Sequence, residues 1–108
     1  MPRAKTRIPK HYTAFRKRYP ALGAALEQVG TAAREAGPLD NKTGHLIQLA
    51  AAAAVHSEGS VRSHARRALA AGATPEEIRH ALVLLTSTIG FPTVAAALSW
   101  VEVVLVRK

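Results

Sequence analysis

The sequence contains no cysteine, which removes a large group of functions from consideration. Disulfide bonds, zinc–thiolate and iron–sulfur sites, and cysteine nucleophiles all require a thiol. Aromatic residues are also few, at 5% of 108 residues, so aliphatic side chains and alanines must fill the core. The length fits one domain with a single core, and 48% hydrophobic with 20% charged residues excludes disorder of the whole chain.

Acidic residues are absent before Glu27, whereas seven basic residues precede it: Arg3, Lys5, Arg7, Lys10, Arg16, Lys17 and Arg18. The net charge of +8 therefore divides into +7 for residues 1–26 and 8 − 7 = +1 for the rest. We expect residues 1–20 to form a basic N-terminal arm or helix start, and residues 21–108 to form one helical domain. Such an arm could bind nucleic acid phosphates or an anionic membrane surface, or could simply be solvated.

Tyr12, Phe15 and Tyr19 lie at helical spacing within this basic segment and share one face of a helix. Aromatic residues so spaced can stack on bases, but they more often anchor a helix to a core. The pattern favours an N-terminal helix that docks onto the body of the protein. No apolar stretch of the length of a secretory signal follows the basic start, so a cytoplasmic location is expected.

Residues 81–101 carry no Asp, Glu, Lys or Arg, and a segment of that length could cross a bilayer. Gly90 and Pro92 at its centre, with several hydroxyl side chains, instead favour two buried helices joined by a tight turn. We therefore expect no membrane span. Helices this apolar in a short chain would expose surface in a monomer, so the protein is expected to be a homo-oligomer.

Glycine–proline breaks near residues 37–38, 72–75 and 90–92 divide an apolar pattern of helical period. Asp40 can cap a helix that runs to about Val55, and a shorter helix from Val61 ends at Gly72. Thr74, Pro75 and Glu77 form a capping box for a helix whose apolar stripe runs from Ile78 to Ile89. The last segment, Val94 to Leu105, is rich in β-branched residues, but its length and alanines favour a helix. The fold class is all-α.

Polar residues interrupt the apolar surroundings in one region, and they are the candidates for chemistry: His45, His56, Ser57, Glu58, Ser60 and His64. His45 and His56 are eleven residues apart and would share a face of one helix. Ser60 and His64 are four apart and would be neighbours on the next. His64 could activate Ser60 or Ser57 as a nucleophile if Glu58 or His45 fixed its tautomer.

Two other interpretations of this cluster remain open. The histidines with Glu58 are acceptable ligands for zinc or iron, although no HExxH-like spacing supports a metal, and none is expected. Alternatively, Ser57 only caps a helix and His64 is an ordinary, partly buried imidazole.

The run from Leu39 to Leu98 resembles the carboxymuconolactone decarboxylase and alkylhydroperoxidase D superfamily. The matching pieces are LDNKTGHLIQLA, SVRSHARRALAAGAT, PEEIRHALVLL and IGFPTVAAAL, and their order is more specific than any one of them. The resemblance implies a helical bundle of about five helices, with an N-terminal helix before a core of four. It also implies dimers, trimers or hexamers with the site near subunit contacts.

In the peroxidase branch of this superfamily, a Cys-x-x-Cys pair reduces peroxide while a Glu and a His relay protons. These positions fall on Ser57, Ser60, His45 and His64, so only the histidine at position 64 matches. A serine hydroxyl cannot cycle through sulfenic acid and disulfide. Thiol peroxidase activity is therefore not expected.

The decarboxylase branch needs no cysteine pair and keeps the histidine, so His64 fits it as a proton donor. Arg62 or Arg66 could hold a substrate carboxylate, since guanidinium binds it through two hydrogen bonds. Three functions follow as hypotheses. The chain is an acid–base enzyme for a small carboxylate or lactone that needs no cofactor, or a non-catalytic structural or ligand-binding oligomer, or a nucleic-acid-associated protein.

Overall fold

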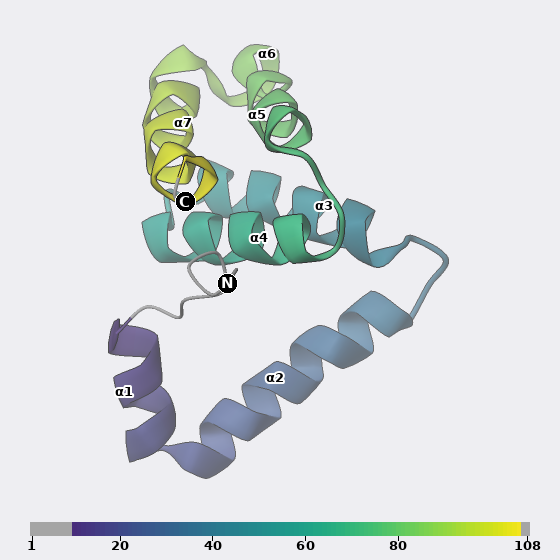
Figure 1. Ribbon diagram of the computed structural model, residues 1–108, viewed down its shortest axis with the longest axis vertical. Helices are drawn as coiled ribbons and strands as arrows, with labels where there is room; N and C mark the ends of the chain where they lie inside the picture. The colour runs from purple at the N-terminus through teal and green to yellow at the C-terminus, as the bar shows by residue number, and fades with distance from the viewer. Residues whose placement is uncertain (1–9, 107–108) are drawn as a thin grey trace.

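Every regular element is an α-helix in the part of the chain that the computed structural model describes, residues 10–106 (Figure 1). The prediction of an all-α fold is confirmed. The helices in chain order are α1 (Lys10–Arg18), α2 (Pro20–Glu35), α3 (Asn41–Ala54), α4 (Glu58–Ala70), α5 (Pro75–Val83), α6 (Thr86–Ile89) and α7 (Phe91–Leu105).

The first two helices form an extension that stands apart from the other five (Figure 1). Pro20 opens α2 and separates it from α1, so one predicted N-terminal helix becomes two. An ion pair of 3.0 Å between Arg16 and Glu27 joins them, and the Phe15 and Tyr19 rings lie 5.5 Å apart. Helix α1 packs against α2, which lies almost wholly within residues 21–108 of the predicted domain, and docking of the aromatic face onto the core helices stays a prediction.

The core lies among α3, α4, α5 and α7. Helices α3 and α4 lie side by side, and α5 and α7 pack across them (Figure 1). Small residues on the facing sides of α3 and α4, including Ala52, Ala53, Ala65 and Ala68, are buried and let the two backbones approach closely. The largest fully buried side chains are aliphatic, as the scarcity of aromatic residues requires: Leu49, Ile78, Leu82, Val61, Val94 and Val101.

Side-chain caps fix where two of these helices begin. The Asp40 carboxylate accepts a hydrogen bond of 2.7 Å from the Thr43 amide at the start of α3. At the start of α5, Thr74 and Glu77 exchange hydrogen bonds of 3.0 Å in each direction, which completes the predicted capping box. Both starts agree with the sequence prediction.

The predicted helix from Thr74 to Ile89 is interrupted, and this part of the prediction is wrong. Helix α5 ends at Val83, and the four-residue α6 begins at Thr86. The Thr86 hydroxyl donates a hydrogen bond of 2.8 Å to the Val83 carbonyl, and so supplies a side-chain partner at the helix end. With the break at Pro20, this interruption accounts for seven helices where about five were expected.

Gly90 connects α6 to α7 in a backbone conformation that only glycine adopts readily, with φ 92° and ψ 150°. We predict that Gly90→Ala lowers the free energy of unfolding by about 1–3 kcal/mol, because a Cβ atom is strained there. Urea unfolding followed by circular dichroism measures this. Gly37→Ala is the comparison, because an added Cβ atom meets nothing within 4 Å and φ lies outside the positive region. Equal effects in the two variants would contradict the strain argument.

None of the helices in the described residues combines the length and the apolar character that crossing a membrane requires.

Candidate functional site

Two histidines predicted to be catalytic meet between α3 and α4. The Nδ1 atoms of His45 and His64 lie 3.2 Å apart, with ring centroids 5.5 Å apart and planes inclined by 36°. His45 is the one buried polar residue in the described part of the chain, at 5% exposure, while His64 keeps more contact with solvent. The contact needs one proton between the two nitrogens, so one ring donates and the other accepts.

Both rings are biased toward the neutral form. Burial is the main cause, and together with the charges of Arg34 and Arg67 it lowers the pKa of His45 to about 4. The pKa of His64 is also lowered to about 4. Burial is the largest cause, and the charges of His45, Arg67 and Arg34 lower this pKa further. At neutral pH the pair therefore holds one proton on each ring.

The arginines whose charges act on the pair are Arg34 and Arg67, which the sequence analysis did not single out. Arg67 lies three residues after His64 on α4, so helical spacing could have identified it. Arg34 lies near the end of α2, and no local pattern relates it to His64. In the described residues neither guanidinium has an ion-pair partner. No carboxylate there offsets the positive charge that acts on the two rings.

Arg62 and Arg66, predicted to bind substrate, are not brought to the histidine pair. Each is two residues from His64 on α4, which places it roughly 200° around the helix. Arg62 pairs with Glu58 at 2.5 Å. Burial, with the charges of Arg67 and Arg62, lowers the pKa of the half-buried Arg66.

The candidate nucleophiles Ser57 and Ser60 lie on the same side of α4 as His64, but neither is bonded to it. Ser57 is the residue before the helix, and its side chain makes no capping hydrogen bond. Ser60 is exposed one turn before His64. In the described residues no hydrogen bond joins either hydroxyl to the imidazole, so the Ser–His contact that a nucleophile needs is not formed.

The predicted grouping of His56 with His45 on one helix face is wrong. Helix α3 ends at Ala54, and His56 follows it in the left-handed conformation with φ 59°. Its Nε2 lies 3.4 Å from the Thr93 hydroxyl at the start of α7. Among the side chains that the structure describes, residues 12–106, no three His, Cys, Asp or Glu converge to hold a metal ion.

The basic segment is described only from residue 10 onward, and Arg3, Lys5 and Arg7 lie outside the described residues. Arg16 is engaged within the molecule, since it pairs with Glu27 and lies over the Tyr12 ring at 5.9 Å. The nucleic-acid hypothesis stays a prediction.

A sequence model described as the carboxymuconolactone decarboxylase family matches residues 20–103. The match includes α2 to α6 and all but the end of α7, and so contains His45, His64 and both arginines near them. No curated protein and no solved structure gives a significant match.

Proposed function

Because the chain belongs to the carboxymuconolactone decarboxylase family, we propose that it is an acid–base enzyme in which the His45–His64 pair moves protons on a small carboxylate or lactone. The observation that carries the proposal is the 3.2 Å contact between the two Nδ1 atoms. Thiol peroxidase chemistry is excluded for this sequence because it has no cysteine.

The contact gives the pair a defined proton arrangement. In two neutral imidazoles that share an Nδ1–H···Nδ1 bond, the donor ring has a free lone pair on Nε2, and the acceptor ring carries a proton on Nε2. The pair therefore presents one base and one acid at its outer edges. Transfer of the central proton alone would leave an imidazolate beside an imidazolium, so the two roles reverse only when the two Nε2 atoms also exchange a proton.

His64 is the ring that we assign to the substrate, and His45 is the positioning residue. His45 is buried and its Nδ1 faces His64, whereas His64 is more exposed on α4. With a pKa of about 4, His64 is an unprotonated base at neutral pH. It can take a proton from water as the water attacks a lactone carbonyl, and return that proton to the oxygen released when the ring opens.

We assign the substrate carboxylate to Arg34 and Arg67 in place of Arg62 and Arg66. The charges of Arg34 and Arg67 reach both rings, and neither has an acidic partner in the described residues. A carboxylate between them would satisfy guanidinium donors and bring the reacting group close to His64. The same positive charge would stabilise the oxyanion that forms on attack at a lactone carbonyl.

The test is turnover of a γ-lactone carboxylate, followed by NMR for ring opening and for loss of carbon dioxide. The same lactone without its carboxylate is the matched substrate, and it is expected to react more slowly because it lacks the group that Arg34 and Arg67 bind. Turnover that is absent in the wild type, or unchanged in His64→Asn, would overturn the proposal.

An oligomeric role is the second candidate, and a specific surface favours it. Leu22, Leu26 and Val29 form one stripe of α2 at helical spacing, and each is at least half exposed. Glu27, Gln28 and Thr31 lie on the opposite, polar side of the same helix. An apolar stripe on an extended helix is suited to packing against a second copy.

We predict that the protein forms a homo-oligomer and that Leu26→Glu dissociates it, because the substitution places a charge within the apolar stripe. Light scattering after size-exclusion chromatography measures the mass. Gln28→Glu adds the same charge on the polar side of α2 and should leave the oligomer intact. A wild-type mass of 11.5 kDa, that of one chain, would contradict this prediction.

A further inference from the structure

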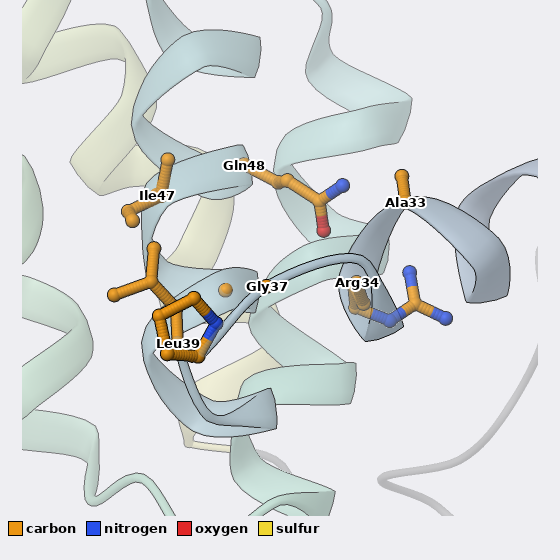
Figure 2. Close-up of a pocket in the computed structure, with 8 residues that line it drawn as sticks. Ala33, Arg34, Gly37, Leu39, Ile47 and Gln48 are labelled. Carbon is orange, nitrogen blue, oxygen red and sulfur yellow. The ribbon is translucent and has the colours of Figure 1, made fainter.

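A cavity of about 240 Å³ lies where the end of α2 and the loop after it approach the start of α3 (Figure 2). Its walls are mostly apolar, and the residues that line it are Ala33, Arg34, Gly37, Pro38, Leu39, Gly44, Ile47 and Gln48. Gly44 leaves room in this wall, because the Arg34 Cγ and Cδ atoms lie 3.8 Å from the place where its Cβ would be.

Apolar surface dominates the cavity, and two polar side chains, Gln48 and Arg34, reach its margin. Figure 2 shows Leu39 and Ile47 together on one side, with the Gln48 amide and the Arg34 guanidinium extending to the other. Arg34 has no ion-pair partner in the described residues. A pocket of this polarity suits a molecule with a compact apolar body and an anionic group.

Gln48 carries the most specific information about the ligand. Its Oε1 atom is buried and has no hydrogen-bond partner in the described residues. A buried acceptor without a donor costs free energy, so such atoms in native proteins usually meet a water, an ion or a ligand. Because this atom has almost no accessible surface, a ligand meets it only when the Gln48 amide turns into the cavity, and the ligand must then bring a hydroxyl or another donor.

We propose that this cavity binds a small hydroxy acid with a compact apolar body. The carboxylate lies against Arg34, the hydroxyl donates to Gln48 Oε1, and the apolar body contacts Leu39 and Ile47. This inference rests on the proposed function in one respect, since both assign the carboxylate to Arg34, although neither histidine lines the cavity. Gln48 follows His45 by three residues on α3. Arg34 lines the cavity, and its charge contributes to the lowered pKa of both rings.

Three probes separate the parts of this proposal. Mandelate has the carboxylate, the hydroxyl and a phenyl ring; phenylacetate lacks the hydroxyl, and lactate lacks the ring. Binding is measured by titration calorimetry and by amide shifts of α3 in NMR spectra of the full chain. We expect mandelate to bind about tenfold more tightly than either of the others, because each loses a group that the cavity accommodates. Equal binding of the three acids, or no binding, would overturn the proposal.

Variants then locate the site. Gly44→Ala adds a methyl group to the cavity wall at an ordinary contact distance, and alanine favours a helix, so weaker mandelate binding cannot come from unfolding. Gln48→Leu should abolish the preference for mandelate over phenylacetate, and Arg34→Gln should weaken both. Arg18→Gln removes the same charge at an exposed position of α1 and should change neither. Unchanged mandelate binding in both Gly44→Ala and Gln48→Leu would overturn the assignment to this cavity.

Failure of this inference can be distinguished from failure of the proposed function. If mandelate binds as described but no carboxylate or lactone is turned over, the binding site stands and the catalytic proposal fails. If a substrate is turned over through His64 while Gly44→Ala and Gln48→Leu leave its KM unchanged, the catalytic proposal stands and this inference fails.

Discussion

Lowering the pH from 7 to 5 is expected to cost the folded protein roughly 2 kcal/mol of stability for each ring of the His45–His64 pair. The folded pKa of each ring is about 4, below the unfolded value of 6.5. Protons therefore bind the unfolded chain first as the pH falls. The stability that the neutral pair contributes is complete above about pH 6.5 and is lost as the pH falls from there toward 4.

The charges around the pair explain why the native state resists these protons. Both rings lie against each other between α3 and α4, and the groups whose charges reach them are Arg34 and Arg67. A proton added to one ring would place an imidazolium beside another ring and two guanidinium groups, without a carboxylate to compensate. The native state can accept the charge only by separating the rings or by admitting an anion.

Urea unfolding at pH 7, 6 and 5 measures this loss while ordinary carboxylates remain ionised. The double variant His45→Asn/His64→Asn should lose most of the pH dependence, because neither amide titrates. His80→Asn changes an exposed histidine of α5 outside the pair and should keep the wild-type dependence. A double variant that loses stability between pH 7 and 5 as steeply as the wild type would show that other groups are responsible.

Helix starts could be predicted from the sequence because their signals are local. The Asp40 cap and the Thr74–Glu77 box involve residues three apart, so the same few residues that carry the pattern also make the hydrogen bonds. The interruption after Val83 could not be predicted, because it involves a hydrogen bond from the Thr86 hydroxyl to the Val83 carbonyl. The spacing of apolar residues carries no signal for that bond. His56 does not share a helix face with His45 because α3 ends at Ala54, two residues before it.

The candidate site was predictable only in part. The family resemblance aligned His45 and His64 with a pair of proton-relaying positions, and the two rings do meet. Arg62 and Arg66 were predicted to bind the substrate of His64. Each is two residues from His64 on α4, and that separation places side chains on opposite sides of a helix. Arg34 and the cavity beside it come from α2, and their place next to α3 depends on how the loop at residues 36–40 turns. No spacing along the chain encodes that turn.

His64→Asn is expected to lower kcat for a lactone carboxylate by about 10²- to 10⁴-fold, the usual contribution of a general base or acid. His45→Leu should lower kcat less, because the base remains but loses the hydrogen bond that orients it. His45→Asn keeps an amide at that position and should restore part of the rate. Steady-state kinetics at saturating substrate measure these effects, and a positioning role requires the order wild type, His45→Asn, His45→Leu, His64→Asn.

The dependence of kcat/KM on pH in the wild type shows whether His64 reacts as a base or as an acid. A base with a pKa of about 4 in the free protein gives a kcat/KM that is constant from pH 8 to 5 and falls by half near pH 4. A proton donor to the carbanion left by loss of carbon dioxide would give the opposite profile, with kcat/KM rising as the imidazolium accumulates toward pH 4. Ser60→Ala is expected to leave kcat unchanged because its hydroxyl is not bonded to His64. A large loss in that variant would replace the paired-histidine mechanism with a serine nucleophile.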